Sequence, residues 1–283
     1  MTQEEGFASF RQGLRIYRLQ SGIDSGVRNM ATDESLLEMV RLQQAPMLIV
    51  RAYRWSEPTL SLGVNQQVRD IHFLLNFYRG DLQPDRPRSS ASEEPDQKVQ
   101  AVVRRPTGGR AILHGEDISY AFITNDPEVL KASLKVSYGI YADIVQQALE
   151  RLSLTVTVAK AAGDKDYLRS PVCFETYTSS DLLGRNGKKL TGSAQLRRYG
   201  GLLQHGAAFL SPYGVGESEF SEALFNATEK AFGQPVENFT EHVFGSSFEP
   251  VFQELQQVYA KVSGEILANV STTSGSHLLP ASR

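Results

Sequence analysis

The chain has 283 residues, of which 41% are hydrophobic and 22% charged, and its formal net charge is -3 at pH 7. No apolar run approaches the roughly 20 residues that a membrane-spanning helix needs, so we expect no attachment to a membrane. The slight negative charge disfavours a general nucleic-acid-binding protein, because such proteins carry a strong basic excess.

Patterns of apolar residues predict an order of strands and helices along the first part of the chain. We expect a strand over residues 14–19 and a helix over residues 27–44, capped by Asn29 or Thr32. Five further strands are predicted at MLIVRAYR, TLSLG, VQAVVRR, RAILH and ISYAFIT, with a short helix at VRDIHFLLNFY between the second and third of them.

The second part of the chain begins with one long amphipathic helix, predicted over residues 129–152. A strand at LTVTVA and a polar loop follow. Two adjacent strands, KKLTGSAQLRR and GGLLQHGAAFL, are joined at a glycine-rich turn, Tyr199-Gly200-Gly201. Two helices over about residues 217–232 and 248–270 complete the pattern.

The predicted elements indicate one domain over residues 14–270, with tails at 1–13 and 271–283. Residues 80–97 are rich in proline, serine and charge and cannot bury much apolar surface, so we interpret them as a mobile insertion inside this domain. Strands joined by hairpin-like turns and mixed with helices indicate an α+β fold, built as a mixed α/β sandwich.

The single cysteine, Cys173, is a first candidate functional residue. One cysteine cannot form an internal disulfide, and the N-terminal sequence lacks the basic-then-apolar pattern of a signal peptide, so we expect a cytoplasmic protein. Cys173 follows a proline in the polar segment SPVCFETYTSSDLL. This context favours a reactive thiol, and the alternative is a small buried hydrophobic residue.

Two glycine-containing segments are further candidates. In RRPTGGRAILH, Gly108 and Gly109 bring backbone N–H groups close to a ligand, and the flanking arginines can attract anions. The alternative is a tight turn with charged flanks. In GKKLTGSAQLRRYGGLLQHG, the small residues at 192–194 would let a long apolar substrate lie against the sheet. Lys189 in that segment has the alternative of an exposed strand lysine. The dispersed histidines predict no metal site.

These motifs together resemble the lipoate-protein ligase, octanoyltransferase and biotin-protein ligase superfamily. RRPTGGRAILH, KKLTGSAQ and LLQHG occur in the order of that superfamily, and NMATDESLL and RWSEPTLSLGVNQ resemble its upstream signature. Within it, the sequence is most similar to LipM-type octanoyltransferases, which carry an acyl-accepting cysteine in a Cys-Phe segment. It departs from the pattern at residues 80–97 and at Gly115 and Ile118. The resemblance implies a biotin/lipoate ligase-like fold of mixed sheets with flanking helices.

The resemblance also implies an acyltransferase without a cofactor. An octanoyl group would pass from acyl carrier protein to Cys173, and then to a lysine of a lipoyl domain or of the glycine cleavage H protein. Lys189, and not Lys188, matches the family lysine, and would favour the thiolate of Cys173 and act as general base. A Cys–His pair using His114 or His205 is the alternative. The implied substrate-contacting residues are Arg104, Arg105, Thr107, Gly108, Gly109, Arg110, His114, Gly192, Ser193, Ala194 and His205.

Other functions remain open at this point. An ATP-dependent lipoate-protein ligase would not need Cys173, an amidotransferase between lipoyl proteins would, and a non-catalytic carrier-binding module would need neither Cys173 nor Lys189. We expect a monomer whose acidic partners dock on a local basic surface, because the chain as a whole is negative. The candidates for that surface are Arg104, Arg105, Arg110, Arg185, Lys188, Arg197 and Arg198.

Overall fold

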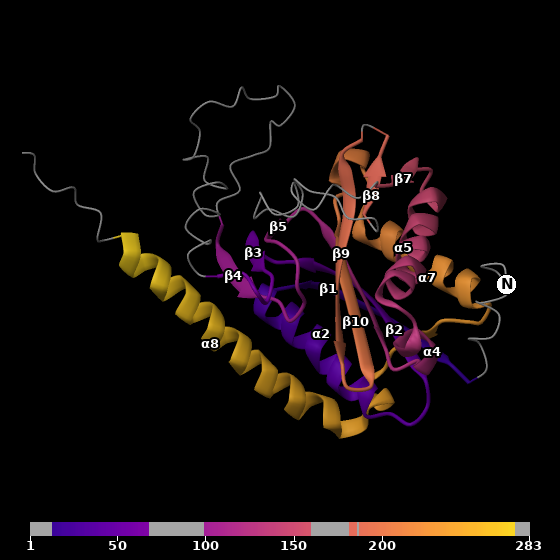
Figure 1. The fold of residues 1–283 in the computed structure, drawn as a ribbon, viewed down its shortest axis with the longest axis horizontal. Coiled ribbons are helices and arrows are strands. Elements are labelled where there is room, and N and C mark those ends of the chain that lie inside the picture. Colours follow the sequence, from indigo (N-terminus) through magenta and orange to yellow (C-terminus); the bar gives the residue numbers. More distant parts are fainter. Residues whose placement is uncertain (1–12, 68–98, 160–180, 186, 275–283) are drawn as a thin grey trace, which may run out of the picture.

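The computed structural model describes residues 13–67, 99–159, 181–185 and 187–274. Two sheets lie in this part of the chain (Figure 1). The larger sheet contains, in spatial order, β11 (Glu237–Asn238), β1 (Arg15–Asp24), β2 (Met47–Trp55), β6 (Ile118–Thr124), β10 (Gly201–Ala208), β9 (Lys189–Arg198), β8 (Leu182–Gly184) and β7 (Val156–Val158). The smaller sheet contains β4 (Ala101–Arg104), β3 (Thr59–Leu62) and β5 (Ile112–His114).

Both sheets are mixed. In the larger sheet, β1 pairs in parallel with β2 and β11, whereas the run from β2 through β6, β10, β9 and β8 to β7 is antiparallel. In the smaller sheet, β3 is parallel to β4 and antiparallel to β5. The parallel pair β1–β2 requires a crossover connection, which a helix provides. The expected mixed sheets with flanking helices are therefore confirmed.

Helices cover both faces of the larger sheet. Side chains alternate along its strands, so that apolar residues project from both faces and each face packs against a pair of helices. Leu48 and Val50 of β2 face a core formed with α5 (Leu134–Arg151) and α7 (Glu217–Phe232). Ile49 and Tyr53 of the same strand face a second core with α2 (Gly26–Arg41) and α8 (Phe248–Ser274). Figure 1 shows α8 running along the outside of α2, on the side away from α5 and α7.

Three element boundaries differ from prediction. The side chain of Ser25, and not that of Asn29 or Thr32, caps α2, by accepting a hydrogen bond from the N–H of Arg28. The predicted helix over 129–152 is two helices, α4 (Pro127–Lys131) and α5. The chain is extended at Ser133, whose side chain caps α5 and so starts a new helix. Finally, α8 continues to Ser274, past the predicted start of the tail.

The insertion at 80–97 and the short helix predicted at VRDIHFLLNFY lie outside the described residues. Sequence patterning missed the short strand β8, although this strand links β7 to the lysine-bearing strand β9. Within the described ranges, no helix is both long and apolar enough to cross a membrane.

Candidate active site

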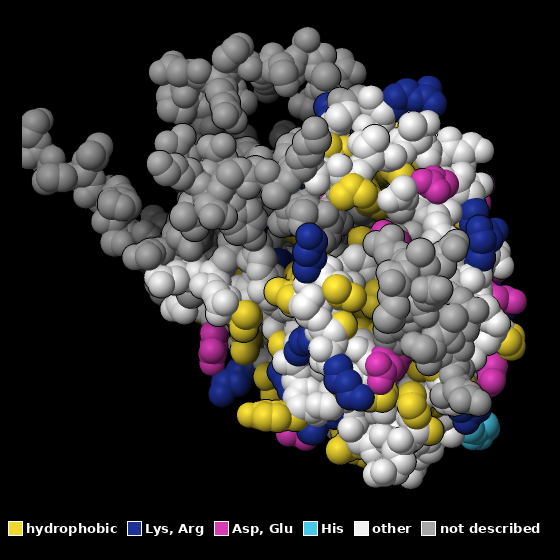
Figure 2. Space-filling view, turned by 45° about the vertical axis from the view of Figure 1, so that its right-hand side comes forward, with side chains coloured by type: hydrophobic (Ala, Val, Ile, Leu, Met, Phe, Trp, Pro, Cys, Tyr) yellow, Lys and Arg dark blue, Asp and Glu magenta, His cyan; other side chains and the backbone are white. Residues whose placement is uncertain are grey.

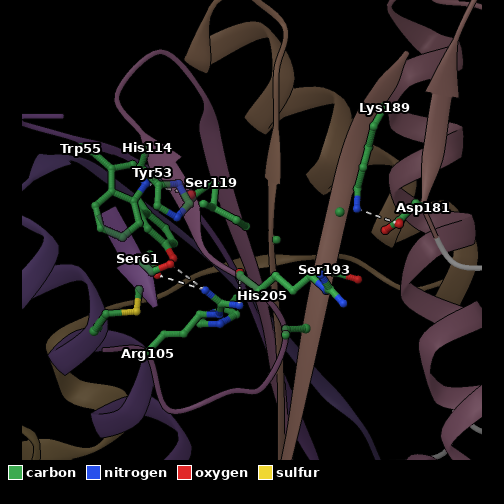
Figure 3. A pocket seen from close by; sticks show the side chains of 17 residues that line it. Tyr53, Trp55, Ser61, Arg105, His114, Ser119, Asp181, Lys189, Ser193 and His205 are labelled. Atoms are coloured by element: carbon green, nitrogen blue, oxygen red, sulfur yellow. Dashed lines mark hydrogen bonds and ion pairs between the residues drawn. The ribbon is translucent and has the colours of Figure 1, made fainter. Parts of the chain in front are cut away.

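A pocket is lined by β9 and β10 of the larger sheet, by β3 and β5 of the smaller sheet, and by the loop before β5. Figure 3 shows its side chains. Its empty space of about 600 Å³ includes open solvent at its mouth. The pocket brings together the predicted residues Arg105, Gly109, Arg110, His114, Lys189, Gly192, Ser193, Ala194 and His205. Arg104, Thr107 and Gly108 are not among its lining residues, and Cys173 lies outside the described residues.

Lys189 is buried at one side of this pocket and faces a carboxylate (Figure 3). Its Nζ atom lies 2.7 Å from Oδ2 of Asp181, and each of the two side chains is only 2% exposed. Lys189 is the first residue of β9, and Asp181 immediately precedes β8, so the pairing of these strands brings the two residues together. The neighbouring Lys188 is exposed. The alternative of an exposed strand lysine at position 189 was therefore wrong.

Two glycines allow close packing around Lys189, and Gly192 is the one that borders its side chain. A Cβ atom on Gly192 would lie 2.7 Å from Cε of Lys189 and 3.0 Å from its Nζ. A Cβ atom on Gly206 would lie 2.5 Å from the carbonyl oxygen of Gly192 and 2.5 Å from the Tyr120 ring. Any larger residue at either position would push the lysine or the strands apart.

His205, at the centre of the pocket, belongs to a buried polar network. Its Nδ1 lies 2.9 Å from Oδ2 of Asp33, and its Nε2 lies 2.7 Å from Oγ1 of Thr107. Asp33 also accepts hydrogen bonds from Arg51 at 2.6 Å and from the Tyr53 hydroxyl at 3.0 Å. Burial opposes the charged form of Asp33, but Arg51 and His205 outweigh it and lower the pKa of this carboxyl.

The direction of each hydrogen bond in this network follows from the charge on Asp33. An ionised carboxylate only accepts, so Nδ1 of His205 carries a proton. Burial lowers the pKa of the His205 imidazole, although the hydrogen bond to Asp33 has the opposite effect, so the ring is neutral at neutral pH. Its Nε2 then accepts the hydroxyl proton of Thr107. Because both ring nitrogens are engaged, this arrangement argues against His205 as the base of a Cys–His pair.

This network gives a first prediction, on stability. Asp33→Ala leaves the Arg51 guanidinium, 1% exposed, without its carboxylate, and breaking such a buried pair costs about 3–5 kcal/mol. We expect urea unfolding to show a loss of that size. A matched control is Glu237→Ala, which removes the exposed partner of Arg15 and should cost about 1 kcal/mol or less. Equal losses of unfolding free energy in the two variants would contradict a stabilising role for the buried Asp33–Arg51 pair.

His114 belongs to a separate group on the opposite side of the pocket. Its Nδ1 lies 2.9 Å from Oδ2 of Asp117, and its ring stacks on Trp55 with a centroid separation of 4.0 Å. Ser119 donates to the same carboxylate oxygen and accepts from Nε1 of Trp55. Burial opposes ionisation of Asp117, but His114 outweighs it and lowers the pKa of that carboxyl. The Trp55 and His114 rings are thus held as a rigid, largely apolar wall.

Arg105 is buried and does not belong to an exposed anion-binding surface, so that expectation was wrong for this residue, whereas Arg104 is half-buried. Arg105 is 4% exposed and donates to the carbonyl oxygens of Ser61, Gly108 and Arg110 at 3.0, 2.8 and 2.7 Å. Arg104 donates to backbone carbonyls of the turn after β3. Both side chains satisfy backbone groups of tight turns, and Arg105 thereby fixes the loop that includes Gly109, whose φ is +88°.

The predicted basic surface is reduced further at the end of β9. Arg198 pairs with Glu34 at 2.5 Å and with Glu38 at 3.0 Å, and Arg197 donates to Oγ of Ser137. The charge of Arg198 is therefore compensated by two carboxylates, whereas Arg197 contacts a neutral hydroxyl. Figure 2 shows Lys and Arg side chains scattered among acidic and hydrophobic ones on the face in view, without forming one patch.

Sequence reasoning missed three residues of the site, although two had a signal. Arg51 interrupts the apolar strand MLIVRAYRW, and a buried arginine requires a buried acid. Asp33 lies on the buried face of α2, where the apolar pattern of the helix is broken. Asp181 had no signal, because its burial depends on the pairing of β8 with β9.

The chain resembles proteins of known families. The profile of the lipoyl protein ligase A/B catalytic domain matches residues 25–259. Octanoyltransferase LipM of Oceanobacillus iheyensis is 33% identical over 184 residues, which cover 65% of this chain and 59% of the relative. Octanoyltransferase LipM of Exiguobacterium sp. is 30% identical over 233 residues, 77% of each chain. The chain spans about three-fifths of the length of several of these relatives.

Solved structures with a similar fold are lipoate ligases. Lipoate-protein ligase A bound with ATP superposes with a TM-score of 0.62 at 17% identity, covering 86% of this chain and 94% of the other. The bipartite lipoate protein ligase of Thermoplasma acidophilum superposes with a TM-score of 0.58 at 16% identity, covering 86% and 92%. At these identities the superpositions show a shared fold.

Proposed function

Because the chain belongs to the lipoyl protein ligase A/B catalytic domain family, we propose that it is an octanoyltransferase. The donor is the octanoyl thioester of acyl carrier protein, and the acceptor is a lysine of a lipoyl domain or of the glycine cleavage H protein. The observation that supports this most is a buried lysine, Lys189, in a pocket whose lining also includes apolar side chains. The relatives named octanoyltransferase LipM point to the same activity.

The pocket can hold the acyl chain. Its lining includes Met30, Tyr53, Trp55 and Ile112, and Gly192 and Ala194 on β9. An octanoyl chain has about seven methylene or methyl groups beyond the carbonyl, and burying each contributes about 0.8 kcal/mol. Binding energy of this size selects a medium chain over a very short one. The chain would lie along the apolar wall with its carbonyl toward Lys189.

The chemistry proceeds in two balanced steps. The Cys173 thiol gives up its proton as its sulfur attacks the donor carbonyl, a new C–S bond forms, the old one breaks, and the carrier sulfur leaves as a thiol with that proton. The amine of the acceptor lysine then attacks the acyl-enzyme, an amide forms, and Cys173 recovers its proton. Both steps conserve or lower the acyl-transfer potential, so neither needs ATP. Positive charge beside the cysteine favours the reactive thiolate, and Lys189 is the proposed source of that charge.

An ATP-dependent lipoate-protein ligase is the second candidate, because a ligase bound with ATP shares the fold. A ligase activates a free acid with ATP, whereas the transferase starts from a thioester. We also propose that the enzyme acts as a monomer in the cytoplasm, where a single cysteine stays reduced, and that residues 14–270 form one catalytic domain.

The test is intact-protein mass spectrometry after incubation with octanoyl carrier protein in the absence of ATP. We expect an octanoyl adduct that neutral hydroxylamine removes, as it does thioesters, and that disappears on addition of a lipoyl domain. Octanoate with ATP serves as the comparison. Modification of the lipoyl domain from octanoate and ATP alone, with no adduct from the carrier, would establish the ligase instead.

A further inference from the structure

The pairing of Lys189 with Asp181 has a consequence for the charge of the lysine. Of the described residues that line the pocket, Asp181 is the one carboxylate, and it lies 2.7 Å from the lysine Nζ. We propose that Asp181 is a positioning residue that keeps Lys189 protonated and aimed over Gly192, so that Lys189 acts as a fixed cation rather than as a free base. This inference rests on the proposed transferase and names the role of one more residue in it.

The surroundings of Lys189 make the carboxylate necessary. Arg105 and Arg110 line the same pocket, and their positive charges oppose a charged lysine. Burial of both partners adds to the cost of the charge. An adjacent carboxylate is the group that offsets both effects.

A buried tyrosine lies close to the Lys189–Asp181 pair. Tyr120 of β6 lies against Gly206, on the strand next to the one that bears Lys189. Burial raises the pKa of the Tyr120 hydroxyl, and the negative charge of Asp181 raises it further. The nearby tyrosine is therefore neutral, and Lys189 forms an ion pair with Asp181.

The geometry also fixes the direction of the lysine side chain. Gly192 has no Cβ, and the lysine Cε and Nζ lie 2.7 and 3.0 Å from the position that this atom would take. Asp181 then holds the far end of the side chain, as Figure 3 shows. A side chain fixed at both points loses little further freedom when the substrate arrives, as a preorganised catalytic charge requires.

A fixed cation suits both steps of the proposed reaction. In the first step it favours the Cys173 thiolate and the negative charge that develops on the thioester oxygen. In the second step it favours the departing Cys173 thiolate. The proton of the attacking amine ends on that sulfur, so no proton needs to pass through Lys189. This differs from the general-base role expected from the family resemblance.

The test uses Asp181→Asn, which keeps the shape and removes the charge. The first measurement is competitive labelling of amines with trace acetic anhydride across neutral and alkaline pH, read by peptide mass spectrometry. Only a neutral amine reacts, and the exposed Lys188 serves as internal reference. We expect Lys189 to become reactive at a pH about one unit or more lower in Asp181→Asn than in the wild type. An unchanged pH of labelling would overturn the proposal.

The second measurement is the single-turnover rate of octanoyl adduct formation over the same pH range. In Asp181→Asn, we expect the alkaline loss of rate to begin about one unit or more lower in pH. Asp143→Asn, an exposed position on α5 outside the pocket lining, is the matched control and should behave as the wild type. A rate lowered equally at every pH would show that Asp181 has only a structural role.

Asp181→Glu covers the case in which Asp181→Asn does not fold. It keeps the charge with a longer side chain, so we expect a lower rate whose alkaline loss begins at the same pH as in the wild type. An alkaline loss of rate that begins closer to neutral pH would overturn the proposal. The labelling result does not depend on octanoyl chemistry. A wild-type chain that forms no adduct at any pH, but whose Lys189 labelling shifts in Asp181→Asn, would refute the transferase and uphold the pairing.

Discussion

Replacing Cys173 by alanine is expected to abolish octanoyl transfer, with a loss of about 10⁴-fold or more in the rate of lipoyl-domain modification. The thiol forms the bond that carries the acyl group between the two partners, and no other cysteine occurs in the chain. The measurement is the rate of octanoylation of a lipoyl domain from octanoyl carrier protein, together with the mass of the enzyme itself, which should show no adduct.

Two controls make this result specific. The unfolding temperature of Cys173→Ala should match that of the wild type, because the sequence around Cys173 predicts a polar loop and not a core position. Cys173→Ser should form an octanoyl ester slowly and pass it on poorly, because an oxygen ester is a weaker donor to an amine than a thioester. Wild-type turnover by Cys173→Ala would rule out the covalent route.

The fold was predictable where local pattern and tertiary packing agree. The helix over Glu217–Phe232 was predicted to the residue, because its apolar face and the glycine that ends it are both visible in the sequence. The break between α4 and α5 was missed, because the apolar pattern continues through it and only the cap at Ser133 reveals it. The short strand β8 exists through its pairing with β7 and β9, which the sequence cannot show.

The site was predictable at its glycines and less so at its charges. A glycine such as Gly192 can be interpreted from the sequence, because it allows another group to approach the backbone closely, as the Lys189 side chain does here. The role of an arginine depends on partners that are remote in sequence. Arg198 was a candidate for the basic docking surface, and it pairs with Glu34, which is 164 positions away. The role of Arg105 depends on carbonyl groups of a loop whose path only the structure gives.

Replacement of Lys189 is the second change with a large expected effect. Lys189→Ala removes the cation and is expected to slow both half-reactions by about 100- to 1,000-fold, the usual loss for one preorganised electrostatic group. Lys188→Ala should change the rates little, because that side chain is exposed. Formation of the octanoyl adduct and its transfer to a lipoyl domain are measured separately, under single-turnover conditions.

Stability must be measured beside these rates, because Lys189→Ala also leaves Asp181 buried without its cation. That loss is expected to cost about 3–5 kcal/mol in unfolding free energy, which could be mistaken for a catalytic effect. The double variant Lys189→Ala, Asp181→Asn removes both charges and should recover much of the stability, but none of the rate. Recovery of the rate together with stability would show that Lys189 supports the fold and not the chemistry. A large loss from Lys188→Ala, with a small one from Lys189→Ala, would show that the register of β9 is wrong.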